Sequence, residues 1–297
     1  MKNFLHVNDF SGDEICEVLE RADELKKAWQ THSMPQSLHN HRIGMSFFGN
    51  GFRNRVAFEM GARAMGAEVT YIPGELGVQE PIEDIAHYLN NWFSMLIIRC
   101  RRHEDIERVS DDARMPVINA RTNRNHPCEI IGDLQYIYEK RGKGGPLRVV
   151  FVGEVTNLCM SWFEAAKVLP IEVTQISPDE YIASQEFVGK WNTGSVGRIR
   201  TSSTMSDIHS DVDILYTDCW PKDREKPMIR ELFLPYQITR DVVEKMSPNG
   251  FFLPCPPVTR GEEIHIDSLM TDQFCDYQAK NCLLHAQNAI MEHCISI

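Results

Sequence analysis

Short apolar segments typical of β-strands alternate with segments of helical periodicity along the chain. The strand-type segments lie at 43–47, 68–72, 95–98, 116–119, 148–152, 171–176, 212–216 and 251–253. Helical spacing is clearest where Ile15, Val18, Leu19 and Ala22 follow a capping box that starts at Ser11. Repeated strand–helix units form parallel sheets that helices cover on both faces. The sequence therefore predicts an α/β fold.

A glycine-rich run divides this pattern into two halves. Residues 142–146 read Gly-Lys-Gly-Gly-Pro, a sequence that interrupts helices and strands. The 297 residues suffice for two ordinary cores. We predict two doubly wound domains, each with a parallel sheet covered by helices, at 1–141 and 147–273, joined by interdomain helices. The last segment, 274–297, is predicted to be a helix that packs back on the first domain.

Composition restricts the class of protein. Apolar residues make up 42% and charged residues 25% of the chain, as in globular proteins. A net charge of −11 argues against non-specific binding to nucleic acid. The nine cysteines lack the spacing of metal ligands, and the first residues do not resemble a signal peptide. We therefore expect reduced thiols in a cytoplasmic protein with no metal, cofactor or membrane segment.

Small and polar residues gather where the predicted strands end. They are residues 51–55, Arg99, 119–126, 153–157, Asp218 and Cys255. Because parallel sheets bind ligands at the carboxyl ends of their strands, we expect one cleft shared by the two halves. The first turn carries Gly49 and Gly51 and opens a helix, an arrangement that favours anions. Arg53 and Arg55 suit a phosphate or carboxylate, although a tight turn with solvated arginines would have the same sequence.

Five ordered blocks carry the strongest motifs. Residues 48–55 read Phe-Gly-Asn-Gly-Phe-Arg-Asn-Arg, and residues 126–129 read His-Pro-Cys-Glu. Residues 152–157 read Val-Gly-Glu-Val-Thr-Asn, 216–220 read Tyr-Thr-Asp-Cys-Trp, and 254–263 contain Pro-Cys-Pro-Pro and Arg-Gly-Glu-Glu. In order and spacing they resemble the aspartate/ornithine carbamoyltransferase family, and its ornithine branch more closely. The matching family blocks are Ser-Thr-Arg-Thr-Arg, His-Pro-Cys-Gln, Val-Gly-Asp-x-x-Asn, Thr-Asp-x-Trp, and His-Cys-Leu-Pro with Arg-Gly-Glu-Glu.

The resemblance implies an enzyme that transfers a carbamoyl group from carbamoyl phosphate to the amino group of an ornithine-like amino acid. It also implies a homotrimer in which a neighbouring chain completes each site. Carried over by position, Arg53 and Arg99 hold the phosphate and His126 binds the carbamoyl oxygen. Such chemistry needs cations on the phosphate and hydrogen-bond donors on the carbamoyl oxygen.

On the acceptor side, the resemblance places Asn157 and Ser161 at the amino-acid end of the acceptor and Asp218 at its ammonium group. Cys255 and Pro256 are expected to border the reacting amine.

The loop after residue 220 departs from the ornithine branch, because Pro-Lys-Asp-Arg replaces Ser-Met-Gly. Lys222 or Arg224 would suit an acidic acceptor, and a solvated charged loop is the alternative. Pro254 also stands where the branch has histidine before its cysteine.

The phosphate loop departs from the family as well. Gly51, Phe52 and Asn54 replace one serine and two threonines. Gly51 keeps a backbone donor, Asn54 is expected to donate through its amide, and Phe52 adds bulk without a side-chain donor.

Three further departures change the expected charge of the donor site. Glu129 stands in place of a glutamine, and Glu75 in place of the glutamine lent to the neighbouring chain. The late arginine that helps to hold the carbamoyl group aligns with Cys282. The site then loses one cation and gains two carboxylates, and a carboxylate ~4 Å from a phosphate costs about 4 kcal/mol at an effective dielectric of 20. Pairing of a glutamate with Arg55 or Arg99 would relieve this cost.

Other interpretations remain open from the residues alone. Glu75 and Glu129 would together suit a cationic guanidino ligand in place of a phosphate donor, and a non-catalytic relative would keep the fold without turnover. The arginines can form structural ion pairs, His126 can cap its helix, and Cys255 can fill buried space. His6 has no recognisable partner pattern in the sequence.

Overall fold

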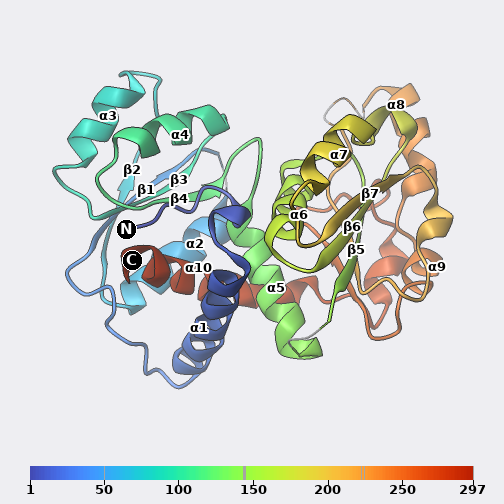
Figure 1. Cartoon of the computed structure of the whole chain (residues 1–297), viewed down its shortest axis with the longest axis horizontal. Helices are drawn as coiled ribbons and strands as arrows, with labels where there is room; N and C mark the ends of the chain where they lie inside the picture. Colours follow the sequence, from blue (N-terminus) through green and yellow to red (C-terminus); the bar gives the residue numbers. More distant parts are fainter. Residues whose placement is uncertain (50, 143–144, 222, 224, 297) are drawn as a thin grey trace. The chain divides into compact units, whose positions relative to one another are not determined.

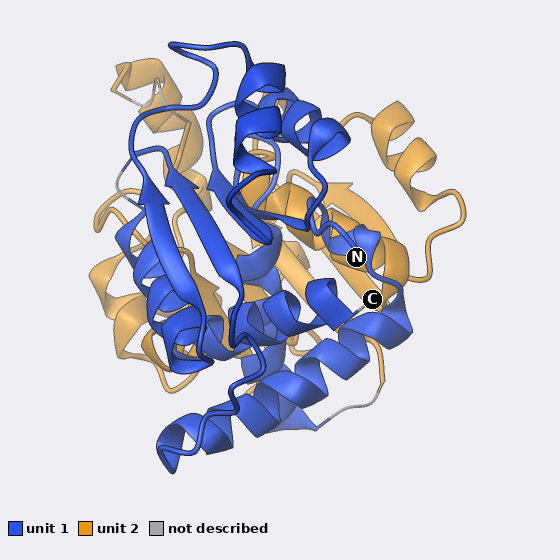
Figure 2. Cartoon of the chain, turned by 90° about the vertical axis from the view of Figure 1, so that its left-hand side faces the viewer, with its two compact units in different colours: residues 1–142, 280–297 blue, residues 143–279 orange. Residues whose placement is uncertain are grey.

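The computed structural model describes residues 1–49, 51–142, 145–221, 223 and 225–296. The chain divides into unit 1, Met1–Gly142 with Lys280–Ile297, and unit 2, Lys143–Ala279, which are coloured separately in Figure 2. Each unit holds one fully parallel sheet, of four strands in unit 1 and five in unit 2. The predicted fold class is therefore confirmed.

In unit 1 the sheet has the strand order β2-β1-β3-β4. Figure 1 shows α3 and α4 on one face of this sheet and α1, α2, α5 and α10 on the other. Leu96 and Ile98 of β3 contribute to the apolar core under α3 and α4. The elements of unit 1 are η1 (Val7–Asp9), α1 (Gly12–Gln30), β1 (Arg42–Phe47), α2 (Phe52–Ala64), β2 (Glu68–Ile72), α3 (Ile82–Leu89), β3 (Met95–Arg99), α4 (His103–Asp112), β4 (Val117–Arg121), α5 (Pro127–Arg141) and most of α10 (Asp276–Ser296).

In unit 2 the sheet has the strand order β7-β6-β5-β8-β9. Trp162 of α6 packs edge-on against Tyr216 of β8, with ring centroids 5.7 Å apart. The elements of unit 2 are β5 (Leu147–Val152), α6 (Asn157–Val168), β6 (Ile171–Ile176), η2 (Asp179–Tyr181), α7 (Gln185–Asn192), β7 (Arg198–Ser202), η3 (Met205–Asp207), β8 (Ile214–Thr217), α8 (Pro227–Phe233), η4 (Leu234–Tyr236), α9 (Arg240–Val243), β9 (Phe251–Pro254) and η5 (Ile266–Met270).

Local sequence signals account for several element boundaries. The backbone N–H of Glu14 donates to Ser11 Oγ at 3.2 Å, and the N–H of Ser11 donates to the Glu14 carboxylate at 2.7 Å, so the predicted capping box starts α1. Pro127 opens α5, where its missing N–H loses no helical bond. Strand β7 was not predicted from the sequence, because only Ile199 of this edge strand is buried.

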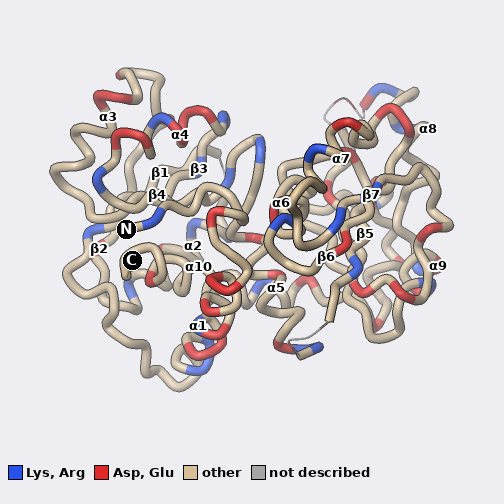
Figure 3. The backbone as a smooth tube through the Cα atoms, viewed as in Figure 1, with Lys and Arg blue, Asp and Glu red and all other residues tan. Residues whose placement is uncertain are grey.

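The distribution of charged residues and the hydropathy of the helices agree with the globular class that the composition predicts. Figure 3 shows acidic and basic residues interspersed over the helices of both units. Among the described residues, no helix combines the length and the apolar character needed to cross a membrane.

Candidate functional site

The phosphate-type turn of unit 1 lies where the strand order reverses. The chain leaves β1 for β2 on one side and returns to β3 on the other, so the carboxyl ends of β1 and β3 flank a switch point. Gly49 takes a φ of +69° in the turn after β1, a conformation that favours glycine. Helix α2 then begins at Phe52. Its first backbone N–H groups are suited to an anion.

Arg99 lies against this turn. Its Nε donates to the Phe48 carbonyl at 3.3 Å. A Cβ on Gly51 would lie 2.7 Å from the same Nε, closer than real contacts allow. The glycine that replaces the family's serine therefore makes room for the Arg99 side chain.

The other two arginines of the turn face aromatic rings. The guanidinium carbon of Arg53 lies 5.0 Å from the ring centroid of Phe52, a side chain that is 55% exposed. The guanidinium carbon of Arg55 lies 3.9 Å from the ring centroid of Tyr71, and its Nε lies 3.9 Å from the Glu59 carboxylate. Phe52 thus supplies a stacking surface for Arg53. A cavity of about 230 Å³, lined partly by Gly49, Gly51, Phe52 and Arg55, adjoins the turn.

Asn54 makes hydrogen bonds within unit 1, and its expected contact with the donor stays a prediction. It is buried, and its Nδ2 donates to the Ala120 carbonyl at 2.9 Å and lies 3.4 Å from His126 Nε2. Its Oδ1 accepts a hydrogen bond of 2.7 Å from Gln287. The amide therefore connects α2 to β4 and α10 inside unit 1.

His126 precedes Pro127 and occupies the N-cap position of α5, where its side chain makes no capping hydrogen bond. It is buried, and its Nε2 lies 3.6 Å from the Glu129 carboxylate. Burial lowers the pKa of His126 to about 3, because the attraction of Glu129 is outweighed by desolvation together with Arg99, Arg121 and Lys280. The imidazole is therefore neutral at pH 7 and can present an N–H to an oxygen.

Glu129 is balanced by a cation that the sequence analysis did not identify. Lys280 of α10 places its Nζ 2.7 Å from Glu129 Oε1 and 2.9 Å from Asp133 Oδ1. Burial opposes ionisation of Glu129, but Lys280, His126 and Arg53 outweigh it and hold the pKa of this carboxyl below its ordinary value. Glu129 is therefore ionised, and its ion-pair partner is Lys280, which also pairs with Asp133, in place of the Arg55 or Arg99 considered above.

Glu75 and Cys282, the other two departures that change the expected charge, also contact side chains of unit 1. Arg101 Nε lies 3.2 Å from Glu75 Oε1, so this glutamate has an ion-pair partner in its own chain. The Cys282 thiol lies 3.6 Å from Lys26 Nζ and 3.9 Å from the Glu139 carboxylate, contacts made by α1 and α5. Both glutamates that the sequence analysis assigned to the donor site therefore have cationic partners within unit 1, Arg101 for Glu75 and Lys280 for Glu129.

In unit 2, the second predicted turn follows β5. Gly153 has a φ of +136°, and Thr156 caps α6 by accepting from the Cys159 backbone N–H. Asn157 and Ser161 occupy the first turns of this helix and are buried. Ser161 Oγ donates to the Asn157 carbonyl at 3.1 Å. Helix α6 therefore begins at Asn157, four residues before Ser161.

The remaining acceptor residues follow β8 and β9, next to one another in the sheet. Asp218 Oδ1 accepts from the Cys219 backbone N–H at 2.8 Å. The backbone N–H of Cys255 donates to the Thr217 carbonyl at 2.8 Å, and Pro256 follows it. The strand order of this sheet reverses between β5 and β8, so Asp218 lies beside the turn that carries Asn157. Lys222 and Arg224 lie outside the described residues.

Glu263, in the Arg-Gly-Glu-Glu block, is buried and has an unusual carboxyl group. One carboxylate oxygen accepts from the Thr259 backbone N–H. Burial raises its pKa to about 7, with smaller contributions from Glu262 and Asp218.

Comparisons with known proteins cover both units. The family model for the aspartate/ornithine carbamoyltransferase, carbamoyl-P binding domain, matches residues 2–139, and the model for the Asp/Orn binding domain matches residues 146–294. Ornithine carbamoyltransferase of Methanosphaera stadtmanae is 32% identical over 307 residues, which span 99% of each chain. That of Hydrogenovibrio crunogenus is 30% identical over 99% of this chain and 98% of the relative.

Solved structures show similarity to the same family. Ornithine carbamoyltransferase from Pyrococcus furiosus superimposes with a TM-score of 0.90 and 26% identity, over 99% of this chain and 97% of that one. The match to the enzyme from Campylobacter jejuni has a TM-score of 0.88 and 27% identity, over 98% of each chain. The resemblance found in the sequence motifs is therefore confirmed, and this chain belongs to the aspartate/ornithine carbamoyltransferase family.

Proposed function

We propose that this chain transfers a carbamoyl group from carbamoyl phosphate to the amino group of an amino acid, with ornithine as the expected acceptor. One observation carries the proposal. Arg53 and Arg99 flank the switch point of unit 1, and the neutral, buried His126 lies at a helix start in the same unit. These residues fall in the segment that matches the carbamoyl-P binding domain of the family.

The proposed chemistry follows from these groups. Arg53 and Arg99 bind the phosphate oxygens, and an N–H of His126 polarises the carbamoyl carbonyl. The uncharged amine attacks the carbonyl carbon, the bond from that carbon to the phosphate oxygen breaks, and the electron pair leaves with phosphate. The amine nitrogen loses one proton, so the products are a ureido amino acid and phosphate.

The acceptor-binding residues are proposed on two grounds, their place in the fold of unit 2 and the family match. Asn157 and Ser161 lie at the start of α6, and Asp218 follows the neighbouring strand, within the segment that matches the Asp/Orn binding domain. We assign the first two to the amino-acid end of the acceptor and Asp218 to its ammonium group. Cys255 and Pro256 are assigned to the surroundings of the reacting amine.

We further propose a homotrimer in which a neighbouring chain contributes to each site through the segment around Glu75. This residue lines a hollow of about 660 Å³ together with Tyr88 and Trp92, whose side chains are more than half exposed. Apolar surface of this kind suits a protein partner. The nine cysteines are free thiols, which fits the proposed cytoplasmic location.

A guanidino donor or ligand is less well supported. That alternative depends on Glu75 and Glu129 acting together as an acidic pair. Each glutamate instead has its own cation, Arg101 and Lys280, so their attraction for a further cation is reduced.

Phosphate release tests the proposal directly. Purified protein is incubated with carbamoyl phosphate and either ornithine, aspartate or arginine, and phosphate and the ureido product are measured. We expect turnover with ornithine. A thermal shift with carbamoyl phosphate should accompany it. Stabilisation by arginine alone, without phosphate release under any condition, would contradict the proposal.

A further inference from the structure

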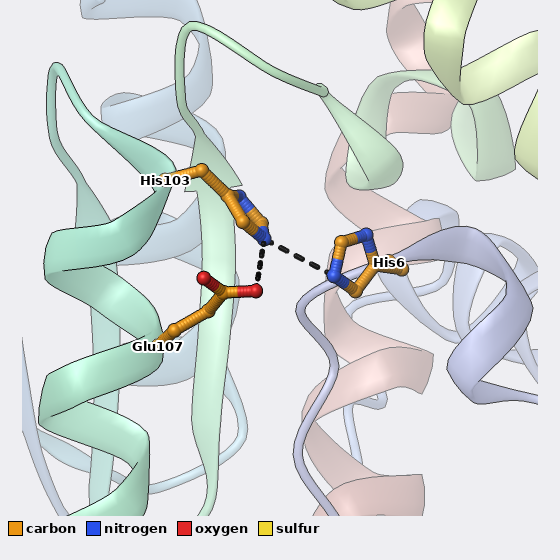
Figure 4. Close-up of side chains that lie close together, drawn as sticks. All are labelled: His6, His103 and Glu107. Carbon is orange, nitrogen blue, oxygen red and sulfur yellow. Dashed lines mark hydrogen bonds and ion pairs between the residues drawn. The ribbon is translucent and has the colours of Figure 1, made fainter.

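Two histidines from distant parts of unit 1 meet beside the loop that leads to His126. His6 lies just before η1, and His103 is the first residue of α4 (Figure 4). Their Nε2 atoms are 3.1 Å apart, and their ring centroids 4.5 Å apart. Glu107 Oε1 lies 3.6 Å from His103 Nε2. The three possible ligand atoms lie within 4.8 Å of one another, which raises the possibility of a metal site.

The neighbouring Asn125 fixes the hydrogen positions on His6. Asn125 Nδ2 lies 2.9 Å from the Leu5 carbonyl and 2.9 Å from His6 Nδ1, and its Oδ1 accepts from Asn119 Nδ2 at 2.6 Å. With the Asn125 amide flipped, its Oδ1 would face the Leu5 carbonyl oxygen and its Nδ2 would face Asn119 Nδ2, and both contacts would be repulsive. The amide therefore donates, and His6 Nδ1 accepts.

The remaining hydrogens then follow in order. A neutral His6 carries its proton on Nε2 and donates it to His103 Nε2. His103 carries its proton on Nδ1, which lies 3.0 Å from Thr122 Oγ1. The Thr122 hydroxyl donates to Asn125 Oδ1 at 3.2 Å. The four side chains thus form a closed ring of hydrogen bonds with both imidazoles neutral.

This order argues against a metal ion. A metal would need the lone pairs of both Nε2 atoms, so the proton of His6 would move to Nδ1. A histidine that binds metal normally donates its other N–H to an acceptor. Here that N–H would point at the N–H of the Asn125 amide.

The ring contacts the loop between β4 and α5 at several points. His6 and His103 hold Asn125 and Thr122, and the backbone N–H of His103 donates to Asn123 Oδ1 at 3.0 Å. Asn125 directly precedes His126. We propose that His6 and His103 are positioning residues that hold this loop, and through it the imidazole of His126, in place for carbamoyl transfer. This inference rests on the function proposed above.

Protonation would break the ring. Burial, His6 and Arg124 keep His103 neutral, with a pKa of about 3. The other charged groups are Glu107, which faces His103, and Asp9, whose carboxylate accepts from the His6 backbone N–H at 2.8 Å. A proton added to His6 Nδ1 would face the Asn125 amide hydrogen.

The test uses paired variants of the full chain. His6→Asn keeps an acceptor for Asn125, and His103→Asn keeps a donor for Thr122, whereas His6→Leu and His103→Leu remove these bonds. We expect kcat to fall on the order of tenfold to a hundredfold in the leucine variants, as for misplacement of a reacting group, and to stay within about threefold in the asparagine variants. The ¹⁵N resonances of His126 should shift in the leucine variants only. Leucine variants with wild-type kcat and unchanged His126 resonances would overturn the proposal.

Tautomers and metal binding in the wild-type protein supply an independent measurement. ¹⁵N NMR at pH 7.5 should show the proton of His6 on Nε2 and that of His103 on Nδ1, and Co²⁺ should not change these signals. A proton on Nδ1 of both residues, or Co²⁺ binding that His103→Leu abolishes, would overturn the proposal in favour of a metal site. A wild-type protein without carbamoyl transfer would refute the proposed function, and the tautomers and the His126 resonances would still report on the ring.

Discussion

Replacing Lys280 by methionine tests the charge balance of the donor site. The Nζ of Lys280 lies 2.7 Å from Glu129 and 2.9 Å from Asp133. The exposed fractions of the three side chains are 12%, 9% and 1%, so solvent screens these pairs little. Lys280→Met keeps the length of the side chain and removes its charge.

The expected loss of stability is large. Removing one partner of a buried ion pair costs about 3–5 kcal/mol, because the remaining charge stays buried without compensation. Protonation of a carboxyl limits the loss at low pH, and the two pairs of Lys280 are not additive. For a unit of this size, such a loss lowers Tm by roughly 6–20 °C. Lys226→Met is the matched control, because Lys226 and Asp223 are 68% and 48% exposed and such surface pairs contribute about 0–1 kcal/mol.

The pH dependence gives a second criterion. The pKa of Glu129 in the folded chain is lowered from its ordinary value of 4.5. Its stabilisation is therefore fully present above about pH 4.5 and is lost as pH falls through the folded value. Urea unfolding followed by circular dichroism should show the largest difference between wild type and Lys280→Met near pH 7 and a smaller one near pH 4. A variant that loses no more stability at pH 7 than Lys226→Met would refute the assignment of Lys280 as the ion-pair partner of Glu129.

Four further predictions concern single groups. Arg53→Ala should abolish the thermal shift with carbamoyl phosphate, whereas Arg63→Ala, on the exposed side of α2, should keep it. Glu129→Gln should leave kcat unchanged or raise it, and loss of turnover would mean that the carboxylate takes part in the chemistry. The pKa of Glu263 in the folded chain is raised from 4.5 to about 7. The stabilisation by its protonated carboxyl is therefore fully present below pH 4.5, and the free energy of unfolding falls by about 3 kcal/mol as pH rises through 7. Glu263→Gln should flatten this slope in urea unfolding. Because the folded pKa of His126 is lowered from 6.5 to about 3, wild-type stability should fall below about pH 6.5, and thermal unfolding in a pH series checks this.

The strands and the turns at their carboxyl ends could be predicted because the signals are local. Continuous apolar runs such as 95–98 mark buried strands, and the glycines after β1 and β5 take positive φ angles that the turns require. Edge strand β7 escaped detection because Arg and Thr alternate around a single buried residue, Ile199. Whether one cleft is shared by the two halves stays a prediction.

The partners of the site residues could not be predicted because they come from distant segments. Two residues along a helix correspond to a rotation of about 200°, so Lys280 and Cys282 point to nearly opposite sides of α10. Cys282 contacts Lys26, while Lys280 contacts Glu129. Lys280 and Gln287 are seven residues apart and share one helix face, and both contact residues of the predicted donor site. This seven-residue spacing is the sequence signal that could have identified Lys280 as a partner of the predicted donor-site residues.

The departures from the family motifs come with compensating neighbours. Gly51 leaves the space that Arg99 occupies, Asn54 is held by Gln287, and Glu129 is paired with Lys280. Considered one at a time, each departure removes a donor or adds a repulsive charge. Considered with its neighbour, each is accommodated by packing, a hydrogen bond or an ion pair, since the Lys280 ammonium group 2.7 Å from Glu129 offsets part of the repulsion between this carboxylate and an approaching phosphate. The family chemistry is therefore compatible with the altered motifs as long as each altered residue keeps its neighbour, and Lys280→Met separates one such pair.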